Sequence, residues 1–256
     1  PGIQVSSGAP ASVANNTVSG YASAPSTWAA IGILLIDAGT TSVTGNNVHD
    51  LMEGMYVQSS DGATVSGNSF TNFRDAAIFT YLSNNGIYTN NQILGGPGTY
   101  GLYIYDLSTN NSLTGNAFRD GDYGVIVDYS GPGAPTGNTF SSNCIAGNTL
   151  AGMATAGTQA GGPINAENNW WGKVDGPDPI GHGDLIDTPA TIDAVPLLVA
   201  TVAGCPVPLD GDGDGLNDPF DNCAAVYNPT QINSDSGPLP PLGFVGAVGG
   251  WSNGPT

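Results

Sequence analysis

Five aspartates near the end of the chain are spaced as ligands for a metal ion. In the stretch "LDGDGDGLNDPFDNC", from Leu209 to Cys223, acidic residues stand at loop positions one, three, five, nine and twelve, counted from Asp210. Gly215 occupies position six, where the backbone must turn sharply, and Leu216 at position seven can offer its main-chain carbonyl. Hard oxygen atoms in this order are the ligands that Ca²⁺ prefers. The predicted calcium ligands are Asp210, Asp212, Asp214, Leu216, Asp218 and Asp221.

The surrounding phrase carries a family resemblance. "DGDGDGLNDPFDNCAAVYNPTQINSD" (210–235) closely resembles a thrombospondin type 3 repeat, including its Asp-Asn-Cys and Asn-Pro-x-Gln signatures. The resemblance implies that the aspartates bind Ca²⁺, and it places a calcium loop at 209–236. A further run of alternating aspartates would follow in that family, but Gly237 stands at its third acidic position, so the sequence supports one complete site. Because five close carboxylates repel one another, we expect Ca²⁺ to be required for local folding.

A repeated phrase precedes this loop. Its versions are "SVTGNNV" (42–48), "TVSGNSF" (64–70), "SLTGNAF" (112–118) and "APTGNTF" (134–140), with "IYTNNQI" (87–93) as a weaker copy. A second, β-prone phrase alternates with the first at a period near 22 residues. Such a period, without helical periodicity, predicts one coil of a β-solenoid per repeat. Stacked coils place equivalent residues in columns, and the asparagines expected in one column are Asn46, Asn68, Asn90, Asn116 and Asn138.

These phrases resemble the right-handed parallel β-helix repeat of the pectate-lyase-like kind, over residues 13–171. The resemblance implies an all-β fold, a right-handed parallel β-helix with a short C-terminal calcium-binding segment, and it implies little about activity. "NNWWGKVDGPDP" (168–179) resembles the closing signature of many such domains, so Trp170 and Trp171 are expected to cap the last coil. The expected regions are a β-helix over 1–180, an extended connector over 181–208, the calcium loop over 209–236, and an apolar tail rich in proline and glycine over 237–256.

The second phrase also predicts which side chains face outward. Alternate residues of a strand point to opposite faces, and aliphatic residues such as Ile33 and Leu35 suit a narrow interior. The other set is expected to form an outer aromatic face with two carboxylates: Tyr56, Phe79, Tyr81, Tyr103, Tyr105, Asp106 and Asp128. One interpretation is a platform for sugar rings, with the aspartates accepting hydrogen bonds from sugar hydroxyls. The other is cover by protein, either the chain's own tail or a neighbouring subunit. We favour protein cover, because monomers rarely expose so large an apolar patch.

The amino-acid composition limits which partners the protein can bind and in which cellular compartment it is expected. The chain of 256 residues holds 3 Lys and Arg against 21 Asp and Glu, a net charge of −18, which disfavours binding to nucleic acid. No apolar run approaches the ~20 residues that span a bilayer, so membrane insertion is not expected. Abundant Asn, Thr, Ser and Gly suit an extracellular or cell-surface protein. There, Cys205 and Cys223 lie on either side of the predicted calcium ligands and are candidates for a disulfide, with Cys144 left as a buried thiol, although three cysteines leave other pairings open.

These features predict a non-catalytic extracellular module. We expect a structural or adhesive β-solenoid, stiffened by Ca²⁺ and self-assembling through its tail or aromatic face, with protein or extracellular glycan as its partner. The alternatives are a glycan-binding module and a carbohydrate-active enzyme, either a polysaccharide lyase or a hydrolase. The best catalytic candidate is the corner at His49 and Asp50, and Asp106 and Asp128 are neighbours that a hydrolase would use. No residue is assigned a catalytic role.

Overall fold

The computed structural model describes residues 1–8, 10–20, 30–188 and 191–205. Contacts divide the chain into two units, Pro1–Pro206 and Val207–Thr256, and the described residues all belong to the first. The predicted calcium loop at 209–236 with its six ligands, the tail at 237–256, and Cys223 lie outside the described residues. They stay predictions.

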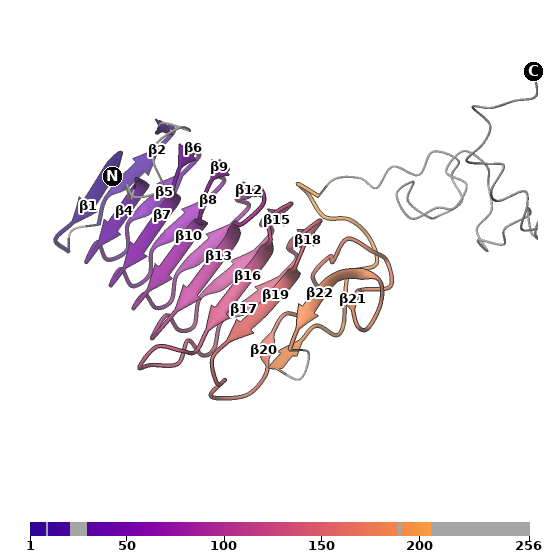
Figure 1. The fold of residues 1–256 in the computed structure, drawn as a ribbon. Coiled ribbons are helices and arrows are strands. Elements are labelled where there is room, and N and C mark those ends of the chain that lie inside the picture. The colour runs from indigo at the N-terminus through magenta and orange to yellow at the C-terminus, as the bar shows by residue number, and fades with distance from the viewer. Residues whose placement is uncertain (9, 21–29, 189–190, 206–256) are drawn as a thin grey trace, which may run out of the picture. The chain divides into compact units, whose positions relative to one another are not determined.

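The first unit is a right-handed parallel β-solenoid of about 7 turns (Figure 1). Along the chain, strands fall in turn into three sheets, and neighbouring strands within each sheet run parallel. The described residues contain no α-helix. The predicted parallel β-helix is therefore confirmed for this part of the chain.

We call the three sheets A, B and C. Within the described residues, sheet A has nine strands, in the spatial order β1 (Ile3–Ser6), β4 (Ile31–Ile36), β7 (Glu53–Gln58), β10 (Ala76–Tyr81), β13 (Tyr100–Tyr105), β16 (Tyr123–Asp128), β19 (Ala151–Ala156), β22 (Gly183–Asp187) and β21 (Pro177–Asp178). Sheet B has eight, β2 (Ser12–Ala14), β5 (Ser42–Thr44), β8 (Thr64–Ser66), β11 (Ile87–Thr89), β14 (Ser112–Thr114), β17 (Thr139–Ser141), β20 (Ile164–Asn165) and β23 (Ile192–Asp193). Sheet C has six, β3 (Thr17–Ser19), β6 (Asn47–Leu51), β9 (Ser69–Phe73), β12 (Gln92–Leu94), β15 (Ala117–Arg119) and β18 (Cys144–Ala146).

Columns of mostly aliphatic side chains fill the interior. On sheet A the two inward positions of each coil are in register from β4 to β16, and each residue there is at most 1% exposed: Ile33, Leu35, Met55, Val57, Ile78, Thr80, Leu102, Ile104, Val125 and Val127. Since successive residues of a strand point to opposite faces, the residues between them lie on the outer face. The predicted division into inward and outward positions is confirmed.

A ladder of buried asparagines closes the corner between sheets B and C. In each rung, the backbone N–H and the side-chain amide of one asparagine both donate to Oδ1 of the asparagine in the next coil, as from Asn46 to Asn68 at 2.9 Å for both bonds. The Asn68 amide also donates to the main-chain oxygen of Val43 at 3.0 Å. The members of this ladder are the half-buried Asn16 at its start and the buried Asn46, Asn68, Asn91, Asn116, Asn143 and Asn169.

For two of the five asparagines the predicted position in this column is wrong. Asn90 is exposed, in a left-handed turn with φ of 55°, and its neighbour Asn91 enters the ladder instead. Asn138 forms its bonds with Asn111, at the corner between sheets A and B, and Asn143 takes the ladder position. The phrase "APTGNTF" therefore lies one corner out of register with its apparent copies. Its letters match, but the ladder spacing grows from 22 residues to 27 in this region, which moves the phrase to another corner.

The solenoid continues past the boundary expected at residue 180. Trp171 is fully buried in the main core, and Trp170 is 3% exposed in a second, smaller cluster. After these residues, β22 pairs with β19 in sheet A, and β23 pairs with β20 in sheet B. Residues 183–187 and 192–193 therefore belong to the solenoid rather than to an extended connector. The two tryptophans pack within the last coils, and further strands follow them.

A disulfide joins Cys144 on β18 to Cys205, with 5.5 Å between their Cα atoms. It replaces the bond expected between Cys205 and Cys223, because Cys205 cannot form both. Cys144 is accordingly not the free thiol that the sequence indicated. Leu198 and Val202 pack against the cluster that contains Cys144, and this packing brings Cys205 back to sheet C across a separation of 61 residues.

Candidate functional site

The outer face of sheet A carries a column of stacked aromatic rings. Tyr56 on β7, Phe79 on β10 and Tyr103 on β13 are in register. Ring centroids are 5.0 Å apart between the first two and 5.2 Å apart between the last two, with interplanar angles of 9° and 10°. The separation follows from the ~4.8 Å between neighbouring strands. We call these three residues the aromatic column.

Four further tyrosines flank the aromatic column on the same face. Tyr81 and Tyr105 stack at 5.8 Å, two residues further along their strands, and Tyr100 and Tyr123 stack at 5.6 Å near the strand starts. Tyr100 also meets Tyr103 edge to face at 5.6 Å. Strand alternation predicts Tyr81 and Tyr105 but, as applied to the repeat, misses the other two. Each of those directly precedes the glycine of the second phrase and lies three residues before an outward position, so strict alternation does not find them.

The predicted aromatic residues are thus brought together in the structure. All seven rings of the face are half-buried, because stacked neighbours cover one another while part of each ring stays accessible. Offset stacking of this kind contributes ~0.5–1.5 kcal/mol per pair beyond the burial of apolar area. The face therefore combines order with accessible ring surface.

The two aspartates expected beside the rings are engaged inside the protein. Asp106 is 2% exposed, and its Oδ1 accepts a hydrogen bond from the backbone N–H of Gly133 at 2.7 Å. Asp128 is 6% exposed and accepts hydrogen bonds from the Tyr103 hydroxyl at 2.5 Å and the Ser130 N–H at 2.7 Å. Burial raises the pKa of Asp128, but these two partners outweigh it and the net pKa is lowered. Asp128 thus holds Tyr103 in place as a charged acceptor.

The aromatic column stops at Tyr103, and a groove follows it. The next residues in the same column are Ile126, Ala154 and Asp187. Ile126 and Ala154 reach less far from the sheet than a ring does, and a groove of about 250 Å³ opens beside Tyr103. Its lining is completed by Tyr100, Tyr123, Thr155 and Ala156. The repeat does not predict this groove, because Asp187 lies beyond the expected end of the solenoid.

A pair of carboxyl groups lies near the strand starts of the same sheet. Glu53 begins β7, and its Oε2 is buried without a hydrogen-bond partner among the described residues. Burial, and then the charge of Asp75 in the next coil, raise the pKa of Glu53 to about 7. Burial also raises the pKa of Asp75. Since Glu53 is partly protonated near neutral pH, it can act there as a proton donor or acceptor. The repeat pattern does not single it out, because its desolvation depends on neighbouring side chains.

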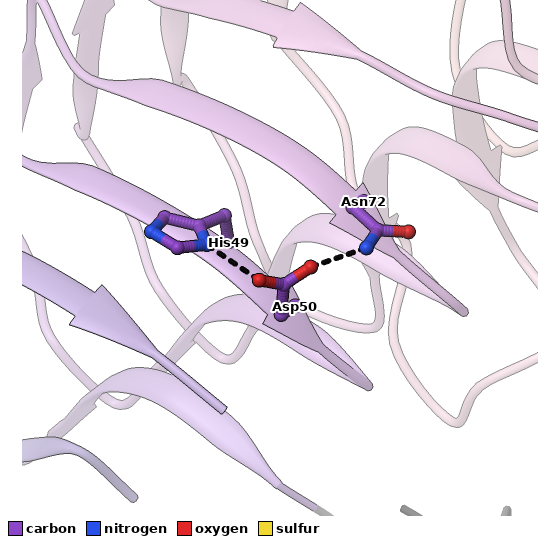
Figure 2. Close-up of polar contacts among 3 residues, drawn as sticks. All are labelled: His49, Asp50 and Asn72. Carbon is purple, nitrogen blue, oxygen red and sulfur yellow. Dashed lines mark hydrogen bonds and ion pairs between the residues drawn. The ribbon is translucent and has the colours of Figure 1, made fainter. Parts of the chain in front are cut away.

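The corner predicted as the best catalytic candidate is a hydrogen-bonded bridge between β6 and β9 (Figure 2). His49 Nδ1 lies 2.8 Å from Asp50 Oδ2, and the Asn72 amide donates to Asp50 Oδ1. Asp50 and Asn72 have φ of 61° and 49°, a left-handed conformation that these residue types tolerate. Hydrogen bonds from His49 and then Asn72 lower the pKa of Asp50. Both of its carboxylate oxygens are engaged, which suits a structural bridge between coils.

The described residues hold neither a metal-binding cluster nor a membrane-spanning helix. Among residues 1–8, 10–20, 30–188 and 191–205, no group of three or more His, Cys, Asp or Glu side chains is placed to hold a metal ion. The predicted calcium ligands are not among these residues. In the same ranges, no helix has the length and apolar character that a membrane crossing requires.

Comparison with known proteins bears on the fold. No solved structure gives a significant match to the chain. Residues 1–170 match the family model described as the right handed beta helix region, which is well over half of the 256 residues. The match ends at Trp170, whereas β22 and β23 extend two of the sheets beyond it. With three parallel sheets wound as one solenoid and a family match over most of its length, the chain belongs to the right-handed β-helix region family.

Proposed function

We propose that the chain is a non-catalytic adhesive module, located outside the cell or on its surface. In this proposal it binds a carbohydrate chain along the outer face of sheet A. The observation that carries the proposal is the aromatic column with its four flanking tyrosines, seven half-buried rings on one sheet face. Sugar rings have apolar C–H faces, which can pack against the outward edges of the stacked rings and against the ring face that the end of the stack leaves open. Tyrosine hydroxyls add polar contacts at the edge of the same surface.

The direction of the face supports a polymeric ligand. The aromatic column runs across successive coils, so its rings repeat along the solenoid every ~4.8 Å. A chain of sugars lying along this direction contacts several rings at once, and contacts that are weak singly add up over the chain. An ordered face also loses little side-chain entropy on binding.

The test is binding of oligosaccharides to the wild-type chain and to Phe79→Ala. Removal of this central ring takes away its own contact surface and the ring on which both Tyr56 and Tyr103 stack, so we expect affinity to fall at least about tenfold in titration calorimetry. Thr64→Ala, on the outer face of sheet B, is the matched control and keeps full affinity. A wild-type chain that binds nothing on a glycan array refutes the proposal.

We also propose that the segment at 209–236 binds one Ca²⁺ ion and is stiffened by it. The spacing of its aspartates supports this. Calcium titrated into metal-free full-length protein is expected to release heat, with affinity lowered at least about tenfold in Asp212→Asn. Asp37→Asn, at an exposed turn of the solenoid, removes the same charge and serves as the control. Equal affinities in the two variants would place the ion elsewhere.

Self-association through sheet A is a second candidate function. The column continues from Tyr56 to Leu34 on β4, so the face stays apolar beyond the rings. Apolar patches of this extent are usually covered by protein. Sedimentation of the full chain is expected to show a concentration-dependent oligomer that Phe79→Asp dissociates. A wild-type monomer at all concentrations excludes this candidate and leaves carbohydrate binding in place.

A carbohydrate-active enzyme remains the third candidate, and Glu53 is the observation that favours it. A carboxyl group with a pKa of about 7 beside a second carboxyl is the pairing that glycoside hydrolysis uses. Release of reducing ends from a polysaccharide, abolished in Glu53→Gln, would establish this activity. No release by the wild-type chain supports the non-catalytic module.

A further inference from the structure

The stack of rings on sheet A ends although the sheet continues. Tyr56, Phe79 and Tyr103 occupy consecutive coils, and the following positions hold Ile126 and then Ala154. One face of the Tyr103 ring packs on Phe79. Because the stack runs along the solenoid, the opposite ring face is directed toward the next coil, where the groove lies. The place of the next ring is therefore open.

The groove has the shape of a site for one ring. Tyr100 stands at 89° to Tyr103, and Tyr123 stacks on Tyr100, so two walls meet at a right angle. Ile126 and Ala154 form the floor and are 8% and 4% exposed. The volume of about 250 Å³ lies below the ~300–1,000 Å³ of sites that enclose drug-sized ligands. It suits a single six-membered ring better than a larger group.

The wall formed by Tyr103 is held rigidly. Its hydroxyl donates to Asp128 at 2.5 Å, and Asp128 is fixed in turn by the Ser130 N–H. With this hydroxyl engaged, Tyr103 offers its ring face rather than a polar group. A ring that is already fixed loses little conformational entropy when a ligand stacks on it.

The charges around the groove select against acidic ligands. Asp187, exposed at the far side, is its one carboxylate, and its described lining has no lysine or arginine. Burial, and then the charge of Asp75 with smaller effects from Tyr123 and Asp122, raise the pKa of Tyr100, so negative charge also reaches the groove from the strand starts. A uronate would meet carboxylates without any cation. An ammonium group is also poorly placed, since Asp187 lies three strand spacings, ~14 Å along the sheet, from Tyr103.

We propose that this groove is the subsite for one neutral pyranose unit, which stacks on the open face of Tyr103 with Tyr100 as its side wall. The proposal rests on the proposed carbohydrate binding and adds the class of sugar and the position of one unit. The sugar ring takes the place that the next aromatic ring would occupy. The spacing of the strands in sheet A thus sets the position of the sugar ring along the solenoid.

The experiment fills the groove and measures the affinity for defined probes. Cellohexaose, mannohexaose and xylohexaose are the neutral probes, hexagalacturonate is the acidic one, and a glucosamine hexamer is the cationic one, all titrated into the full chain. Ile126→Tyr extends the stack into the groove, and we expect at least about a tenfold loss of affinity for the best neutral probe. Tyr103→Phe keeps the ring and is expected to stay within about threefold. Ile87→Tyr, exposed on β11 of sheet B, is the matched control and binds as the wild type does.

A second variant guards against misfolding of the first. Tyr100→Leu changes a half-buried side chain and removes the side wall of the groove, so we expect neutral binding to weaken about fivefold. Neutral binding that is lost in Phe79→Ala but kept in both Ile126→Tyr and Tyr100→Leu overturns the subsite and leaves the proposed function standing. Tighter binding of the acidic or cationic probe overturns the neutral assignment. Absence of binding by every probe overturns both proposals.

Discussion

The asparagine ladder and the aromatic column are both rows of like residues created by the stacking of coils, but only the ladder is closed. From Asn16 to Asn169 each ladder amide donates to the next, and the links between Asn46 and Asn169 are buried. The aromatic column spans three coils and ends at Tyr103 with an open ring face. The ladder satisfies its own hydrogen bonds, whereas the aromatic column leaves ring surface accessible to a ligand.

The difference shows which repeated residues the fold requires and which it does not. A buried polar row must be complete, because each missing member leaves donors and acceptors without partners. An outer apolar row has no such requirement, and the fold tolerates Ile126 or Ala154 in place of a ring. The aromatic column is therefore not demanded by the solenoid, which makes it the better candidate for function.

The largest effect is expected where the ladder is broken. Asn91→Ala leaves the buried Asn68 N–H and one Asn68 amide donor without their acceptor, and the Val65 carbonyl without its donor. At ~1–2 kcal/mol for each group, the free energy of unfolding should fall by about 3–6 kcal/mol. Urea denaturation followed by circular dichroism measures this loss.

The adjacent residue supplies the control. Asn90→Ala changes an exposed side chain in a left-handed turn and should cost only about 1–2 kcal/mol of backbone strain. Equal losses in the two variants would mean that the ladder is not closed in the way described. They would also reopen the column position that the sequence assigns to Asn90.

The second effect concerns the link between the last coils and sheet C. Cys205→Ser removes a disulfide that spans 61 residues, and the free energy of unfolding should fall by about 2–4 kcal/mol. Cys223→Ser is the matched variant, and we expect it to leave the stability of the solenoid unchanged. The reverse result would restore the pairing of Cys205 with Cys223 that the sequence indicated.

A smaller effect is expected on the outer face. Phe79→Ala removes two stacked contacts from a half-buried position and should lower the free energy of unfolding by about 2 kcal/mol, less than a break in the ladder. Denaturation of this variant beside Asn91→Ala measures the contrast directly. A loss as large as that of Asn91→Ala would make the aromatic column a structural element and weaken the functional argument.

Periodicity predicts much of this fold because its signals are local. Parallel strands, the inward aliphatic columns and five of the outer rings all follow from alternation within single strands. The ladder register is less predictable. The letters Thr-Gly-Asn recur at two different corners, as at Asn116 and Asn138, and insertions between strands decide which corner a phrase reaches.

The groove and the disulfide depend on packing over long distances. Asp187 joins the outer column only because β22 returns to sheet A after the two tryptophans. Cys205 meets Cys144 only because the last described residues fold back over sheet C. Similarly, the Asp128 carboxylate is drawn inside by Tyr103 and Ser130, which alternation alone does not indicate. Spacing in the sequence carries no record of these contacts.

The smallest effect is expected at Glu53, where the stability contributed by the outer face should depend on pH while that of the ladder does not. The ladder has no titratable group, whereas the outer face includes a carboxyl whose pKa is raised from 4.5 to about 7 in the folded state. The stability linked to this raised pKa is fully present below pH 4.5 and is lost as the pH rises through about 7. After discounting for partial exposure, we expect a decline of about 1 kcal/mol in the free energy of unfolding between pH 5 and pH 8 that Glu53→Gln abolishes.

Two controls separate Glu53 from the other carboxyl groups. Asp184, whose burial raises its pKa to about 6, titrates in both the wild type and Glu53→Gln, so the difference between the two proteins isolates Glu53. Asp37→Asn controls for the loss of one negative charge. If Glu53→Gln retains the wild-type slope, the carboxyl is solvated, and the argument for acid chemistry on this face fails while the neutral-sugar groove is untouched.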